Sequence, residues 1–208
     1  MRGRWIISLI YLVRHGETAW NSGKRIQGQS DIPLSERGMR QAEAVAARLA
    51  GVGLDVLYAS DLGRARITGE LIAGRQPRPV SVLLRPELRE CDYGQWEGLT
   101  WSEAEQRFPE EWRNWKAGSG RPVGGEDIVS LAERTGRLFD EAAGNGRTVL
   151  ISAHRGSLRT ILCHALGMPQ AFRDRFDIAN CSVSVLECPA GGRARLLLLN
   201  DTCHLEGV

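Results

Sequence analysis

Arg14, His15 and Gly16 directly follow an apolar run at residues 5–13. Such a run predicts a buried strand, and ligands in open α/β sheets bind outside the carboxyl ends of the strands. Arginine offers a planar fork of donors that fits phosphate oxygens. A neutral imidazole can attack phosphorus and form an adduct that water then hydrolyses. Glycine lets the backbone approach an anion closely. The trio therefore points to phosphate chemistry, although an Arg-His pair at a strand end is more often only a solvated end.

A second histidine occupies an equivalent place in the chain. Residues 148–153 form another buried-strand pattern, and His154 follows it with Arg155 and Gly156 next. A single histidine at a strand end is usually structural. Two histidines at matching ends, each beside an arginine and a glycine, favour a functional site. If the two strands are neighbours in the sheet, both imidazoles project into one crevice.

The segments that must position these residues alternate between strand-like and helix-like patterns. This alternation predicts an α/β fold, a three-layer α/β/α sandwich with a mostly parallel central sheet. Strands are expected at residues 5–13, 55–59, 81–84, 147–153, 182–187 and 193–200. Four helices are expected from the sequence: 36–50 with Ser35 as N-cap, a helix after the cap Ser60-Asp61 to about 73, a helix opened by residues 124–127 and running to about 143, and one at about 158–166.

One segment, 87–122, differs in character because it holds four of the six tryptophans. We expect a helical excursion at about 95–122 that packs over one end of the sheet. Most of these tryptophans are expected to be core, with one lining a pocket. The whole chain, 1–208, is expected to form one domain.

The composition sets limits on the partners. A formal net charge of +2 over 208 residues is too small to argue for nucleic-acid binding. No stretch reaches the length of a membrane-spanning helix, and the N-terminal apolar run lacks a signal-peptide cleavage site, so no membrane partner is expected. The five cysteines lack CxxC spacing and predict reduced thiols in a cytoplasmic protein. Cys163 beside His164 is expected to be a packed thiol and not a metal pair, because adjacent helical positions point in different directions.

Six segments resemble, in order and over nearly the whole chain, the motifs of the histidine phosphatase superfamily, which includes the cofactor-dependent phosphoglycerate mutases. They are residues 12–21, 27–35, 60–68, 88–98, 124–126 and the block around His154. Residues 94–100 look like the phosphatase branch, which includes α-ribazole and broad-specificity phosphatases. The resemblance implies a phosphoglycerate mutase-like fold, a small-molecule phosphate ester as substrate, and neither a metal nor a cofactor.

The resemblance also implies roles for particular residues. His15 would attack phosphorus and become a phosphohistidine, while Arg14, Arg64 and His154 would bind the non-bridging oxygens. Glu90 would protonate the leaving alkoxide and later deprotonate water. Its near competitor is Glu87, and without the resemblance Glu90 reads as a surface carboxylate paired with Arg89 or Arg85. Phosphate or substrate contacts are expected from a further set of residues: Gly16, Asn21, Gln27, Gly28, Arg155 and Gly156. Asn180 and His204 also match family motifs, and His204 is expected to be mainly structural.

The chain departs from the family pattern at the second histidine. The family commonly has Ser or Thr, His, Gly, Gly, whereas this chain has Ala153, His154, Arg155 and Gly156. Ala153 removes a hydroxyl that could orient the imidazole. Arg155 adds a cation that contacts either the substrate or solvent, with solvent slightly favoured, and it would be strained if the backbone there required a positive φ.

Three functions remain as alternatives. The first is a phosphomonoesterase, favoured because the interval between the catalytic-acid segment and Gly124-Gly125-Glu126 is shorter than in typical mutases. The second is a phosphoglycerate mutase that uses the same residues. The third is a phospho-ligand-binding module without catalysis, motivated by the changes at Ala153 and Arg155. A homodimer is an open alternative as well, because the final strands can be edge strands that pair between subunits.

Overall fold

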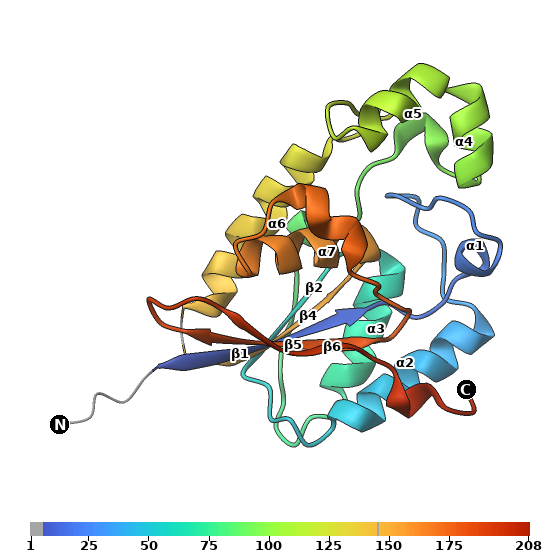
Figure 1. Ribbon diagram of the computed structural model, residues 1–208. Helices are drawn as coiled ribbons and strands as arrows, with labels where there is room; N and C mark the ends of the chain where they lie inside the picture. The colour runs from blue at the N-terminus through green and yellow to red at the C-terminus, as the bar shows by residue number, and fades with distance from the viewer. Residues whose placement is uncertain (1–5, 145) are drawn as a thin grey trace.

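The computed structural model describes residues 6–144 and 146–208, and a twisted six-stranded sheet forms its centre (Figure 1). The strand order is β3-β2-β4-β1-β5-β6. The first four of these strands are mutually parallel, β5 runs antiparallel to β1, and β6 runs antiparallel to β5. The strands span Ile7–Arg14 (β1), Val56–Ala59 (β2), Val82–Leu84 (β3), Thr148–Ala153 (β4), Val183–Pro189 (β5) and Arg195–Asp201 (β6). The mostly parallel sheet expected from the sequence is therefore confirmed.

Helices cover both faces of the sheet, with α6 and α7 on one side and α2 and α3 on the other (Figure 1). Alternate residues of each central strand face opposite layers. In β1, Leu12 packs in the cluster that includes residues of α6 and α7, whereas Val13 packs in the cluster formed with α2. The helices span Ala19–Ser22 (α1), Glu36–Leu49 (α2), Gly63–Ala73 (α3), Trp101–Arg107 (α4), Pro109–Lys116 (α5), Ile128–Ala143 (α6) and Arg155–Ala165 (α7). Because both strand faces are apolar, the sheet needs both layers to exclude water.

Two helices begin at other residues than the sequence predicted. The predicted N-cap of α2 is confirmed, because the Ser35 hydroxyl accepts the N–H of Gly38. The N-cap of α3 is Leu62, whose apolar side chain offers no acceptor for a capping bond. The Ser60 hydroxyl oxygen accepts the N–H of Leu62 at 3.3 Å and also contacts the His154 ring. Helix α7 begins at Arg155, three residues earlier than expected, with His154 as its N-cap. The second histidine therefore stands directly between a buried strand and a helix N-terminus.

Helices α4 and α5 form the expected excursion, which lies apart from the two main layers (Figure 1). It has its own apolar cluster around Trp96, which is fully buried, together with Trp115 and Leu131 of α6. Trp112 packs against this cluster, but Trp101 is 39% exposed. A separate small core explains how this segment holds its place over one end of the sheet. None of the described helices is both long and apolar enough to span a bilayer.

Candidate active site

The two histidines of the sequence analysis meet at one edge of the sheet. Strands β1 and β4 are parallel neighbours with Arg14 opposite Ala153, so the next residue of each chain segment is a histidine. The His15 N–H donates to the Ala153 carbonyl at 3.0 Å. The imidazole rings of His15 and His154 have centroids 5.1 Å apart. The two rings are therefore neighbours, as expected, although of the two only His15 lines the cavity described below.

The His15 ring is held as a neutral base. Its Nδ1 lies 2.7 Å from the carbonyl oxygen of Gly16, and because a carbonyl oxygen can only accept, Nδ1 carries the proton. Burial first, and then the charges of Arg64 and Arg14, hold the pKa of His15 well below its ordinary value. The ring is therefore uncharged at neutral pH, and its Nε2 keeps a free lone pair, which is the form that a nucleophile requires.

Two buried arginines flank His15, each with only part of its donors used. Arg14 donates from one terminal nitrogen to the Ile178 carbonyl at 2.8 Å. Arg64, on α3, donates to the carbonyls of Gly28 and Ser30, each at 2.7 Å. Burial, and then the nearby charge of Arg155, lower the pKa of Arg14 to about 9, which leaves the guanidinium charged at neutral pH. Both arginines are thus fixed cations.

His154 is completely buried, and a serine from a neighbouring strand end orients it. Its Nε2 lies 2.9 Å from the Ser60 hydroxyl oxygen. Ser60 thus supplies a hydroxyl to the ring where Ala153 has none. Burial, and then the charge of Arg64, hold the pKa of His154 well below its ordinary value, so this ring is also neutral. Nδ1 of His154 has no hydrogen-bond partner among the described residues.

The Glu90 carboxylate is fixed from two sides by backbone donors. One oxygen accepts the Gly156 N–H at 3.0 Å, and the other accepts the N–H of Cys91 at 2.9 Å. The first contact ties the carboxylate to the first turn of α7, immediately after the second histidine. Glu87, the competing carboxylate, instead forms an ion pair with Arg85, with 3.3 Å between the nitrogen and the oxygen. The structure therefore places Glu90, and not Glu87, beside the histidines.

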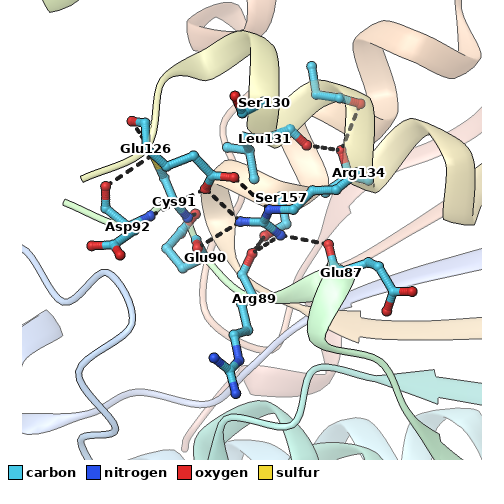
Figure 2. Close-up of polar contacts among 12 residues, drawn as sticks. Glu87, Arg89, Glu90, Cys91, Asp92, Glu126, Ser130, Leu131, Arg134 and Ser157 are labelled. Atoms are coloured by element: carbon cyan, nitrogen blue, oxygen red, sulfur yellow. Dashed lines mark hydrogen bonds and ion pairs between the residues drawn. The ribbon is translucent and has the colours of Figure 1, made fainter. Parts of the chain in front are cut away.

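Arg134 of α6 holds the segment that carries Glu90, as Figure 2 shows. Its guanidinium donates to the carbonyls of Glu87, Arg89 and Glu90 at 2.6, 2.7 and 3.0 Å. It also pairs with both oxygens of Glu126 at 2.8 Å. The sequence analysis missed this role. The only signal was Glu126 in the Gly-Gly-Glu motif, because contacts to backbone carbonyls leave no trace in the types of residues contacted.

Replacing Arg134 by glutamine is expected to lower kcat for phosphate esters more than it raises KM. The change removes three donors that fix the backbone around Glu90, and small displacements of a catalytic group cost rate. We expect a loss of roughly 10- to 100-fold in kcat, measured by steady-state phosphate release. Arg137→Gln, at an exposed position on the same helix, is the matched control. Equal kcat in the two variants would contradict the positioning role of Arg134.

A cavity of about 650 Å³ opens over this group. Most of the residues that the sequence singled out line it: Arg14, His15, Asn21, Gln27, Gly28, Arg64, Glu90, Arg155, Gly156 and Asn180. Gly16 and His154 are not among the lining residues. Gly16 instead makes room for α2, because a Cβ there would lie 2.3 Å from the carbonyl oxygen of Gly38. His154 is fully buried, with its ring next to that of His15.

More tryptophans line the cavity than the sequence analysis expected. Three of the four in this segment, Trp101, Trp112 and Trp115, line the cavity, whereas one was expected. Helices α4 and α5 present them together, with Trp101 and Trp115 stacked at an interplanar angle of 22°. Periodicity in two short helices could not show which ring faces the cavity, because that depends on where the excursion docks.

Arg155 lies on the rim and is not strained. It is exposed, it lines the cavity, and it does not appear among the described non-glycine residues with positive φ. Because it is the first residue of α7, its backbone is helical and an arginine fits there. The Arg155 side chain therefore lies at the mouth of the cavity, where both solvent and a ligand in the cavity can reach it.

One group among the described residues could hold a metal ion, namely Asp201, Cys203 and His204. None of these three lines the cavity, and the His204 ring bonds to the Cys181 carbonyl at 2.9 Å. Cys163 is fully buried in the core, whereas its neighbour His164 bonds to Asp140 at 2.8 Å. All five cysteines are free thiols.

A parallel sheet, a buried histidine pair at its carboxyl edge and two fixed arginines define an α/β enzyme that handles phosphate. A family model for the histidine phosphatase superfamily, branch 1, matches residues 10–202. The chain therefore belongs to the histidine phosphatase superfamily, as the sequence motifs indicated, and it is a histidine phosphatase-type enzyme with a phosphoglycerate mutase-like fold.

Relatives within this family carry different names. Phosphoserine phosphatase 1 of Hydrogenobacter thermophilus is 34% identical over 94% of this chain and 93% of its own length. A probable phosphoglycerate mutase GpmB of Cronobacter sakazakii is 40% identical over 84% of this chain and 82% of its own. Among solved structures, a mycobacterial glucosyl-3-phosphoglycerate phosphatase aligns with a TM-score of 0.83 and 30% identity. The alignment covers 94% of this chain and 100% of that one.

Proposed function

We propose that this protein is a metal-independent phosphomonoesterase that hydrolyses a small phosphorylated metabolite through a phosphohistidine on His15. One observation carries the proposal. Three buried nitrogens, Nε of Arg14, Nε of Arg64 and Nδ1 of His154, have no partner among the described residues. Buried donors are almost always hydrogen-bonded, so an acceptor-rich ligand is the natural partner for this set. A phosphoryl group offers three acceptor oxygens beside the His15 ring.

The chemistry follows from the neutral state of His15 and from the positions of Glu90 and the arginines. Nε2 of His15 attacks phosphorus while the bond from phosphorus to the ester oxygen breaks, and Glu90 gives its proton to that oxygen. Arg14 and Arg64 stabilise the charge on the equatorial oxygens. The Ser60 hydroxyl donates to Nε2 of His154, which leaves Nδ1–H of that ring to donate to the phosphoryl group. Glu90 then takes a proton from the water that attacks phosphohistidine, and His15 returns to its free form.

The second candidate is a phosphoglycerate mutase, favoured by the identity to the relative named as a probable mutase. The two functions differ in where the phosphoryl group goes, to water or back to the product. We expect this protein, given 3-phosphoglycerate with a trace of the 2,3-bisphosphate, to release inorganic phosphate faster than it forms 2-phosphoglycerate. Enzymatic quantification of both products decides the matter. Faster formation of 2-phosphoglycerate, with little phosphate, would establish the mutase instead.

We also propose that the chain acts as a single domain in the cytoplasm. Five free thiols, four of them buried, suit a reducing compartment. A homodimer through β6 is a further proposal, supported by the place of that strand at the sheet edge. Two of its side chains, Leu197 and Leu199, are 49% and 40% exposed. Nothing in the modest net charge argues for a nucleic-acid partner.

A further inference from the structure

Arg155 is a cation at the mouth of the cavity that pairs with none of the described residues. It is exposed, and its guanidinium makes no hydrogen bond or ion pair with any described part of the chain. The residue after it, Gly156, donates its N–H to the Glu90 carboxylate at 3.0 Å. A Cβ on Gly156 would lie 2.2 Å from the other oxygen of the Glu90 carboxylate, so the backbone next to Arg155 packs closely against Glu90. Arg155 therefore lies next in the chain to the residue that holds the Glu90 carboxylate.

The charges around Arg155 are not balanced by the protein. Eight cationic side chains line the cavity but only two carboxylates, those of Glu90 and Asp174. Asp174 is already engaged by Arg159 at 3.2 Å and lies 3.7 Å from Arg173. Burial lowers the pKa of both Arg14 and Arg159, and the positive charge of Arg155 lowers the pKa of each further. Repulsion of this kind disfavours the empty site, and a bound anion relieves it.

A single phosphoryl group does not use all of this positive charge. In the proposed reaction its oxygens accept from the buried, unpartnered nitrogens of Arg14, Arg64 and His154. Arg155 is exposed and lines the same cavity, so its guanidinium is available to a group on the alcohol part of the ester. A neutral leaving group would place nothing opposite the guanidinium, whereas a carboxylate or a second phosphate would form a charge-assisted, two-pronged hydrogen bond.

We propose that Arg155 binds a second anionic group on the substrate, so that the preferred substrates are phosphate esters whose alcohol part carries a carboxylate or another phosphate close to the ester oxygen. This inference rests on the proposed hydrolysis at His15. It assigns Arg155 a role in selecting the substrate, separate from the phosphoryl-binding role of Arg14 and Arg64. It also gives a reason for an arginine at the position where the chain departs from the family pattern.

The test compares pairs of phosphate esters whose members differ in the presence of one further anionic group. O-phosphoserine is paired with O-phosphoethanolamine, 3-phosphoglycerate with glycerol 3-phosphate, and 1,3-propanediol bisphosphate with propyl phosphate, so the arms separate a carboxylate from a phosphate. We expect wild-type protein to prefer the member with the extra anion in at least one arm by roughly 10- to 100-fold in kcat/KM, the worth of a hydrogen bond between charged groups. Arg155→Gln should bring that ratio close to one, and Arg155→Lys should retain part of it.

Arg40→Gln, an exposed arginine on α2 away from the cavity lining, is the matched control and should keep the wild-type ratio. The same ratio in wild type and Arg155→Gln, or a wild-type ratio near one in every arm, would overturn the role of Arg155 while leaving hydrolysis intact. Failure of wild-type protein to release phosphate from any ester, p-nitrophenyl phosphate included, would instead overturn the proposed function and this inference with it.

Discussion

His15→Ala is expected to abolish phosphate release from alkyl esters and from p-nitrophenyl phosphate alike, with kcat reduced on the order of 10⁴-fold or more. The neutral His15 ring, with its proton fixed on Nδ1 by the Gly16 carbonyl, is the only nucleophile that the proposed reaction uses. Removing it leaves the arginines able to bind the substrate but nothing to receive the phosphoryl group. Steady-state assays give kcat, and alkaline quenching of wild-type protein during turnover of a radiolabelled ester should yield label at position 15.

The matched control for this variant is His164→Ala. That ring lies outside the active-site cavity and bonds to Asp140, so its loss should leave turnover near the wild-type rate. Equal p-nitrophenol release by wild type and His15→Ala would mean that the site only binds phosphate ligands. A wild-type protein that turns over but never carries label at position 15 would rule out the covalent intermediate.

Glu90→Gln is expected to affect substrates according to how much their leaving groups need a proton. An alkoxide is a poor leaving group, so loss of the acid should lower kcat for alkyl phosphates by roughly 10²- to 10⁴-fold. Nitrophenolate leaves readily without a proton, so the loss for p-nitrophenyl phosphate should be much smaller in the phosphorylation step. Single-turnover measurements separate this step from the later hydrolysis of phosphohistidine, in which Glu90 also acts.

Glu87→Gln is the control for Glu90, since its carboxylate pairs with Arg85 and does not line the cavity. It should leave both classes of substrate nearly unaffected. An equal loss for nitrophenyl and alkyl esters in Glu90→Gln would argue against Glu90 as the acid. Glutamine retains one oxygen that can accept the Gly156 N–H, but its NH2 group cannot accept the Cys91 N–H that the other Glu90 oxygen accepts. The comparison between nitrophenyl and alkyl esters therefore carries the test, because a purely structural loss lowers both alike.

The sequence alone determined the main architecture and the core of the site. Apolar runs ending in Arg14-His15 and in His154 predicted buried strands, and parallel strands necessarily bring their carboxyl ends to one edge. The N-cap Ser35 was also predictable, because capping depends on residues three positions apart. These features are local in the chain or follow from strand order, so patterns of residue type reveal them.

Tertiary structure decided how the site is supported. The Ser60 hydroxyl, which the sequence suggested as part of a helix cap, accepts the N–H of Leu62 and also bonds to His154, which lies 94 residues further along the chain. Arg134 holds carbonyls of residues 44 to 47 positions earlier, and Trp101 and Trp112 reach the cavity only because the excursion docks above it. Contacts of this kind depend on how distant segments pack together. Backbone carbonyls and ring faces carry no residue-type signal that local periodicity can record.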